Sequence, residues 1–285
     1  MRVLILGVTG MLGNAVFKVF SEDPNHEVFG TLRSPDAAKY FPVATRGRLV
    51  SGIDVLDRDA VVRLLDRVRP EVVINCTGII KQLESANDPL TILPINAMFP
   101  HQLAGLCALT GARLISLSSD CVYSGRKGNY EESEPSDAED LYGKSKNIGE
   151  VLQQGHAITL RTSGIGHELN SNNGLLEWFL SQEGKVKGYV RAIYSGIPSV
   201  ELARTIRDFV LPHPELHGLY HVSAKPISKF DLLTLIAGVY GKKIMIERDD
   251  GVAVDRSLNS RRFTEATGYV APEWPALVAL MQSHR

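Results

Sequence analysis

The sequence predicts an α/β fold, with a doubly wound parallel sheet and a smaller, discontinuous α/β lobe. A short apolar run from Arg2 to Leu6 is closed by Gly7, and helical periodicity follows from Met11 to Phe20. Similar strands and helices then alternate as far as Thr162. Because each strand of such an alternation is followed by a helix that crosses over the sheet, we expect parallel strands with helices on both faces.

The remaining elements follow in chain order. Further strands are expected at Glu27 to Leu32, Leu49 to Ile53, Glu71 to Cys76, Arg113 to Ser118 and His156 to Arg161, and helices at Arg58 to Val68 and about Ser85 to Leu109. Beyond Thr162 a polar, turn-rich stretch indicates a crossing to a second lobe. We expect a first domain at 1–162, to which about 196–223 return, and a second lobe made of 163–195 and 224–285.

Composition excludes several classes of function. The 285 residues are 44% hydrophobic and 22% charged with a formal net charge of -1, which is typical of a soluble globular protein and offers no electrostatic footprint for nucleic acid. Cys76, Cys107 and Cys121 lack metal-type spacing and are interpreted as reduced thiols, so we expect no metal and a cytoplasmic location. No apolar run approaches membrane-spanning length, so no membrane is expected.

The turn Gly-Val-Thr-Gly-Met-Leu-Gly at 7–13 lies between a strand and a helix, the context in which such glycines indicate a dinucleotide site. Gly7 would permit the sharp turn, Gly10 would let the backbone approach a pyrophosphate, and Gly13 would let the helix pack closely on the strand. The phosphates would lie at the helix N-terminus, where free N-H groups favour negative charge. A tight turn with incidental glycines is the structural alternative.

The residues after the second strand favour NADP, with NAD also allowed. Where an acidic residue would bind the ribose 2'-hydroxyl of NAD, the chain has Arg33 and Ser34, and Arg33 would pair with a 2'-phosphate while Thr31 or Ser34 would donate to it. Asp54 would accept from the adenine amino group. The expected cofactor-binding residues are Gly7, Thr9, Gly10, Met11, Leu12, Gly13, Arg33, Ser34, Asp54, Val55, Cys76, Thr77, Gly78, Asn96, Tyr142 and Lys146.

Tyr142 and Lys146 are candidates for acid-base chemistry. Four residues apart on a helix, their phenol and ammonium would share one face, and the cation would lower the pKa of the phenol. Tyr123 and Lys127 have the same spacing, but two glycines make a helix there unfavourable, whereas Tyr142 follows Asp137, a suitable N-cap. Ser119 ends a strand at the carboxyl edge, where a hydroxyl would hold a substrate carbonyl oxygen.

These motifs together resemble the extended short-chain dehydrogenase/reductase superfamily, particularly the dTDP-4-dehydrorhamnose reductases and related nucleotide-sugar reductases. The likeness rests on the glycine turn, Ser-Ser-Asp-Cys-Val-Tyr-Ser-Gly at 118–125, Tyr-Gly-Lys-Ser-Lys-Asn-Ile-Gly-Glu at 142–150 and Arg-Thr-Ser at 161–163. It implies a Rossmann-type NADP-binding domain and a substrate-binding lobe. It also implies a catalytic triad of Ser119, Tyr142 and Lys146, with Lys146 holding the nicotinamide ribose and Asn96 as a structural asparagine.

Asp120-Cys121 departs from the Asp-Glu pair of dehydratase relatives, and a thiol does not simply replace that carboxylic acid. Fucose-synthase-like epimerase/reductases carry a cysteine at the corresponding position, so Cys121 is either a proton shuttle or a buried thiol. Lys81 and Arg256 are candidates for a substrate diphosphate, and Trp178 for stacking on a base or for ordinary core packing. The candidate substrate-binding residues are Lys81, Ser119, Asp120, Cys121, Trp178 and Arg256.

The resemblance implies NADPH-dependent reduction of a nucleotide-linked 4-keto-6-deoxy sugar, in surface polysaccharide or deoxysugar biosynthesis. Two alternatives stay open: a nucleotide-sugar epimerase or epimerase/reductase that uses Cys121, and a non-catalytic NADP-binding regulatory subunit. The sequence leaves the sugar, the nucleotide and the oligomeric state undetermined, with a homodimer as one option.

Overall fold

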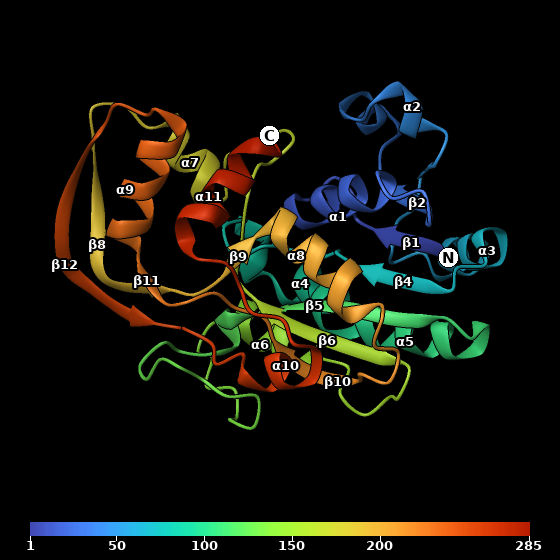
Figure 1. Ribbon diagram of the computed structural model, residues 1–285. Helices are drawn as coiled ribbons and strands as arrows, with labels where there is room; N and C mark the ends of the chain where they lie inside the picture. Colours follow the sequence, from blue (N-terminus) through green and yellow to red (C-terminus); the bar gives the residue numbers. More distant parts are fainter.

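The computed structural model describes residues 1–285 and contains a seven-stranded sheet in the order β10-β6-β5-β4-β1-β2-β3 (Figure 1). Its strands are β1 (Arg2–Leu6), β2 (Glu27–Leu32), β3 (Leu49–Ser51), β4 (Val72–Asn75), β5 (Arg113–Ser119), β6 (Ala157–Thr162) and β10 (Gly218–His221). Every neighbouring pair is parallel. The chain therefore moves outward from β1 in both directions, and the predicted doubly wound α/β class is confirmed.

Helices cover both faces of this sheet. They are α1 (Met11–Ser21), α2 (Val43–Arg46), α3 (Arg58–Val68), α4 (Pro89–Ile92), α5 (Phe99–Thr110), α6 (Leu141–Ile148), α7 (Leu175–Ser181), α8 (Ser199–Thr205), α9 (Lys229–Tyr240), α10 (Arg261–Thr267) and α11 (Trp274–Ser283). The 3-10 helices are η1 (Pro35–Tyr40), η2 (Glu84–Asn87) and η4 (Asp120–Val122), and the π-helices are η3 (Leu93–Met98) and η5 (Ile206–Val210).

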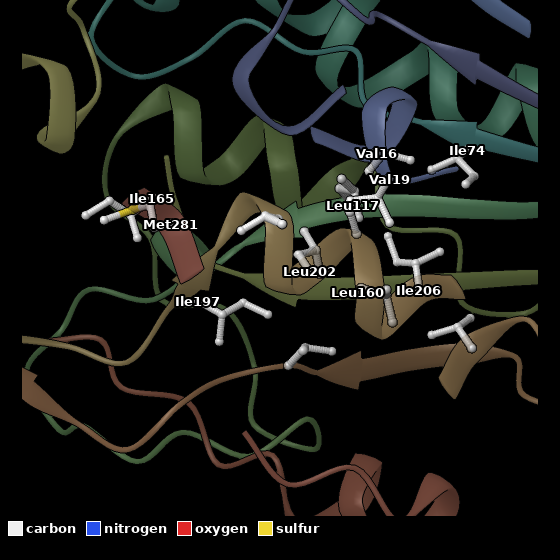
Figure 2. Packing of buried hydrophobic residues seen from close by; sticks show 14 of the residues in the cluster. Val16, Val19, Ile74, Leu117, Leu160, Ile165, Ile197, Leu202, Ile206 and Met281 are labelled. Atoms are coloured by element: carbon white, nitrogen blue, oxygen red, sulfur yellow. The ribbon is translucent and has the colours of Figure 1, made fainter. Parts of the chain in front are cut away.

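Side-chain alternation along β1 divides the core into two layers. Val3 and Ile5 join the larger buried cluster, which includes residues of α1 and α8, whereas Leu4 and Leu6 join the cluster that includes residues of α3 and α5. Figure 2 shows the first layer, where side chains of α1, α8 and η5 meet those of β4, β5 and β6. Because both faces of β1 are buried, the strand has the continuous apolar sequence typical of a parallel sheet.

The second lobe contains a three-stranded sheet in the order β11-β8-β12, formed by β8 (Lys185–Tyr194), β11 (Ile227–Ser228) and β12 (Met245–Asp255). In Figure 1, β8 and β12 form a long ribbon beside α9 at the left. The sequence pattern predicts no strand at 185–194. The reason is that charged pairs across the two strands, Lys185 with Glu247 and Lys187 with Asp249, replace a clear apolar alternation.

Two strand pairings connect the later part of the chain to the main sheet and its neighbouring segment. After β8, the short strand β9 (Ile197–Pro198) pairs with β7 (Gly164–Ile165), and the chain then continues through α8 to β10, which pairs with β6. Residues 196–223 thus lie against the main sheet, as the sequence pattern predicts for this return. The boundaries of the two predicted domains stay a prediction.

The segment Pro89–Thr110 is one helical stretch that is long and apolar enough to cross a membrane by length and composition. The expectation that no apolar run reaches this length is therefore wrong, because α4, η3 and α5 follow one another without a break. Its residues Phe99 and Leu103 are buried in the core beneath the sheet. Core helices of soluble proteins meet the same criterion, so the criterion alone is weak evidence for insertion.

Candidate active site

Most of the predicted cofactor residues lie at the carboxyl edge of the sheet, because they follow β1, β2, β3 or β4, which run in the same direction. Gly7 directly follows β1 with a φ of 80°, in the left-handed region that favours glycine. Gly13 lies in the first turn of α1, where an added Cβ would be 2.1 Å from the carbonyl oxygen of Gly7. The turn can therefore close on the helix only with glycine at this position.

The N-terminus of α1 is suited to a phosphate group. Gly10 is its N-cap and makes no side-chain capping bond, so no side chain takes the first N-H groups of the helix. A Cβ on Gly10 would meet only the Gly7 oxygen at 3.6 Å, so the space above the turn is open. Backbone donors, the helix dipole and this open approach fit the pyrophosphate of a dinucleotide.

The end of β2 separates the residues predicted for the 2'-phosphate. Thr31 is buried, and its hydroxyl accepts a hydrogen bond from the Gly7 amide at 3.0 Å, so Thr31 supports the glycine turn, and its burial is unfavourable for contact with a phosphate. Arg33 and Ser34 are exposed just beyond the strand. After β3, Asp54 accepts from the Leu56 amide at 2.9 Å through one carboxylate oxygen, which leaves its other oxygen without a partner in the protein.

The loop after β4 carries Cys76, Thr77 and Gly78. The Thr77 hydroxyl donates to Asn75 at 2.5 Å, and burial raises the pKa of the Cys76 thiol to about 12. Asn96 lies buried in η3, where its carbonyl oxygen accepts from the Ile79 amide at 2.8 Å and its amide nitrogen donates to the Ile79 carbonyl at 3.0 Å. Asn96 therefore holds this loop in place, which agrees with a structural asparagine.

Helix α6 presents the predicted acid-base pair. Its N-cap is Asp140, which accepts from the Gly143 amide at 2.7 Å. The prediction that Asp137 is the N-cap is wrong, because Asp137 instead accepts from the amide and hydroxyl of Ser124 at 2.7 and 2.5 Å. The helix begins three residues later than that prediction requires.

The electrostatics of Tyr142 differ from the sequence-based expectation. Its side chain is partly exposed, but burial raises the pKa of the phenol above its usual range, the Cys121 thiol nearby acts in the same direction, and the Ser119 hydroxyl opposes them. The expectation that the pKa of the phenol is lowered toward neutral pH is therefore wrong for this structure, and Tyr142 is a neutral proton donor at neutral pH.

The amine of Lys146 is directed to the sheet. Nζ donates to the Leu117 carbonyl at 2.8 Å, near the end of β5. Burial lowers the pKa of Lys146 to about 8, while the Glu150 carboxylate and the Cys76 thiol act to raise it. Because i and i+4 side chains share a helix face, Tyr142 and Lys146 face the same edge, but a backbone carbonyl holds the amine.

Ser119 closes β5 beside the phenol. Its hydroxyl donates to Asp120 at 3.1 Å and accepts from the Cys121 amide at 3.1 Å. Asp120 is buried, and burial raises the pKa of its carboxyl while Arg256 lowers it. Burial also raises the pKa of the Cys121 thiol to about 12, so the thiol is protonated at neutral pH.

Three cations from distant segments face this acid and thiol. Lys81 binds Asp140 at 2.6 Å, and Arg256 donates through Nε to the Tyr123 carbonyl at 2.7 Å. The third is Lys229, at the start of α9, whose pKa is lowered by burial and raised by Asp120, with Arg256, Cys121 and Lys81 as further titratable neighbours. Sequence reasoning missed Lys229 because nothing in its neighbourhood in the chain marks it.

Two remaining predictions concern residues outside this cluster. Tyr123 is fully buried, with its hydroxyl donating to the Glu131 carbonyl at 2.9 Å, and Lys127 binds Glu134 at 2.6 Å, so this second Tyr-Lys pair is structural as predicted. Trp178 is 38% exposed on α7, and its role in base stacking stays a prediction.

Comparison with known proteins identifies the family. Residues 1–248 match the family model described as RmlD substrate binding domain. The chain belongs to this family. The resemblance inferred from the glycine turn and the 142–150 motif is thereby confirmed.

Named relatives of this family member fall into two groups. It is 25% identical to the dTDP-4-dehydrorhamnose reductase of Aggregatibacter actinomycetemcomitans over 245 residues, which is 82% of this chain and 78% of that protein. It is 34% identical to the methionine adenosyltransferase 2 subunit beta of Xenopus laevis over 154 residues, which is 53% of this chain and 43% of that protein. The match therefore spans less than half the length of that subunit.

A solved structure of similar fold is that of dTDP-4-dehydrorhamnose reductase from Bacillus anthracis str. Ames in complex with NADP, with a TM-score of 0.81 at 20% identity, covering 100% of this chain and 98% of that one. The UDP-glucose 4-epimerase of Thermus thermophilus in complex with NAD gives a TM-score of 0.78 at 19% identity, with 100% and 98% covered. At these identities the likeness establishes the fold alone, so reductases and epimerases share the architecture.

Proposed function

We propose that the protein is a reductase that uses NADPH to reduce the 4-keto group of a nucleotide-linked 4-keto-6-deoxy sugar. The observation that carries this proposal is the meeting of a neutral Tyr142 phenol and the Ser119 hydroxyl at the sheet edge that also presents the uncapped N-terminus of α1. The naming of relatives as dTDP-4-dehydrorhamnose reductases supports the same substrate class.

The residues present fit NADP. Backbone N-H groups at the start of α1 would hold its pyrophosphate, and the exposed Arg33 and Ser34 would hold its 2'-phosphate. Bound NADPH supplies a hydride to the keto carbon. Asp54 and Val55 lie after β3 at the same edge and would border the adenine, with NAD as the weaker alternative because Arg33 and Ser34, and no acidic residue, directly follow β2.

The chain itself supplies the proton. As the carbonyl carbon becomes tetrahedral, Tyr142 transfers its phenolic proton to the carbonyl oxygen and Ser119 donates a hydrogen bond to the same oxygen. The O-H bond of the tyrosine breaks, and the new alcohol keeps that proton. The amine of Lys146 stabilises the resulting phenolate by its charge, and solvent returns the proton because Tyr142 is partly exposed.

The cations on the substrate side would bind the diphosphate. The amine of Lys229 and the terminal nitrogens of Arg256 have no hydrogen-bond partner in the protein, although both residues are at least partly buried. Unpaired donors of this kind favour a multiply charged anion. Lys81, which is already paired with Asp140, would contribute charge more than a direct bond.

The two alternatives are less well supported. For an epimerase that uses Cys121 as a base, the raised pKa is unfavourable, because a thiol with a pKa of about 12 is rarely deprotonated at neutral pH. For a regulatory subunit, the support is the name of relatives that match about half of this chain.

We further propose a cytoplasmic location, since all three cysteines are free thiols, and no contact with membranes or nucleic acid. A homodimer remains a proposal.

The test follows nicotinamide absorbance while freshly made dTDP-, UDP- and GDP-4-keto-6-deoxy sugars are added in turn. Stoichiometric consumption of NADPH with one of them is expected. Sugar isomerisation with no net consumption would instead identify an epimerase. NADPH binding without turnover of any sugar, together with co-purification of a partner enzyme, would favour the regulatory subunit.

A further inference from the structure

A buried ion pair lies directly behind the catalytic edge. Glu150 follows α6, and its side chain is only 1% exposed, while that of Arg161 on β6 is 4% exposed. Arg161 binds both carboxylate oxygens, with Nε to Oε1 and a terminal nitrogen to Oε2, each at 2.6 Å. Ser118 on β5 donates to Oε1 at 2.7 Å. One carboxylate therefore joins α6, β5 and β6.

The same carboxylate acts electrostatically on the amine of Lys146. Glu150 is four residues after Lys146, and its charge is the main influence that opposes the effect of burial on that amine. The Leu117 carbonyl that accepts from Lys146 immediately precedes Ser118, which Glu150 holds. Glu150 thus acts on Lys146 in two ways, through its charge and through the position of the Leu117 carbonyl.

Arg161 has further partners besides Glu150. Arg161 uses its remaining nitrogen on the Tyr123 hydroxyl at 2.6 Å and lies 3.4 Å from a ring nitrogen of His221 on β10. The guanidinium is therefore also held by Tyr123 and β10, and the carboxylate is the member of the pair whose charge acts on Lys146. The titratable groups that act on Lys146 are Glu150 on its own helix region and Cys76 from the loop after β4.

We propose that Glu150 is a positioning residue, which keeps the amine of Lys146 protonated and fixed against Leu117 through its ion pair with Arg161. A buried ion pair adds little net stability over apolar side chains of similar volume, so stability alone does not explain its presence beside the lysine. The inference rests on the proposed function only in giving Lys146 a role in the reaction. The effect on Lys146 itself is independent of the sugar.

The test compares Glu150→Gln, the double variant Glu150→Gln with Arg161→Met, and Lys146→Met. The measured quantity is the affinity for NADPH as a function of pH, by quenching of protein fluorescence. In the unchanged protein, affinity should fall as pH rises through the pKa of Lys146, which is about 8. In both Glu150 variants the fall in affinity should occur at a lower pH, by about one unit, because the negative charge that stabilises the Lys146 ammonium is gone. Lys146→Met should show no such transition.

The double variant keeps the test decisive. Glu150→Gln alone leaves a buried, unpaired guanidinium and can unfold for that reason, whereas removing both charges avoids this defect. A midpoint for the double variant equal to that of the unchanged protein would overturn the proposal. Because this measurement needs no sugar, the two proposals can fail separately. If the protein reduced no sugar but the variants showed the shifted midpoint, the proposed reaction would be disproved and this inference would stand.

Discussion

The cofactor side of the site depends on short stretches of chain, whereas the substrate side depends on contacts between segments far apart in the sequence. Gly7, Gly10 and Gly13 lie within one turn and one helix start, and their geometry follows from local constraints. Arg256, by contrast, reaches its place by binding the carbonyl of a residue 133 positions earlier in the chain, and Lys229 arrives on α9. The difference teaches that motifs reveal a cofactor well before they reveal a substrate.

Tyr142 lies between the cofactor side and the substrate side of the site, so its substitution should have the largest effect on activity. We expect Tyr142→Phe to lower kcat for keto-sugar reduction by about 10²- to 10⁴-fold, because the variant has no proton to give to the carbonyl oxygen. NADPH affinity should be nearly unchanged, as measured by fluorescence titration. Tyr189→Phe on β8 is the matched control and should retain full activity. Full turnover by Tyr142→Phe would exclude the tyrosine from this role.

On the cofactor side, two alanine variants separate folding from binding. Gly13→Ala places a Cβ 2.1 Å from the Gly7 carbonyl oxygen. We expect it to lower the free energy of unfolding by about 1 to 3 kcal/mol, through forced backbone movement, and to abolish NADPH binding. Gly10→Ala meets nothing closer than 3.6 Å and should weaken NADPH binding while leaving urea denaturation unchanged. Equal destabilisation by both variants would contradict this account of the turn.

The contrast also explains what the sequence could predict. The strands around β1 and the helices α1 and α3 were predicted closely, because burial on both faces gives strands a continuous apolar sequence and helices a clear period. The strands β8 and β12 were not, since cross-strand pairs such as Lys187 with Asp249 stabilise them in place of apolar alternation. Such pairing is visible only after the two strands are brought together.

Within the site, motifs predicted residue identity better than electrostatics. Ser119, Tyr142 and Lys146 were chosen by spacing, and the structure brings the hydroxyl groups of Ser119 and Tyr142 together. Spacing could not predict that Lys146 would donate to the Leu117 carbonyl, because that depends on how α6 packs on β5. The pKa of a buried phenol depends likewise on its full surroundings.

On the substrate side, Lys229→Met should raise KM for the nucleotide sugar about tenfold, the effect of losing one charge-assisted hydrogen bond to a phosphate oxygen. The affinity for NADPH should not change, because Lys229 is grouped with Asp120 and Cys121 and not with the glycine turn. Lys225→Met is the control, since Lys225 is exposed in the same segment and binds Glu273. An equal rise of KM in both variants would mean that general surface charge attracts the substrate, and Lys229 would lose its assignment.

The smallest effect is expected from Arg33, because it is exposed and a solvated ion pair is worth little. Arg33→Ala should lower the affinity for NADPH about fivefold, equivalent to about 1 kcal/mol, and should leave the affinity for NADH unchanged, since only NADPH carries the 2'-phosphate. Arg48→Ala is the matched control, because Arg48 is also exposed but immediately precedes β3, at the opposite edge of the sheet. If the Arg33 variant lost both cofactors equally, the residue would act on the loop after β2 and not on the phosphate. Selectivity for NADP would then lie with Ser34, and the cofactor side would depend on more than its local turns.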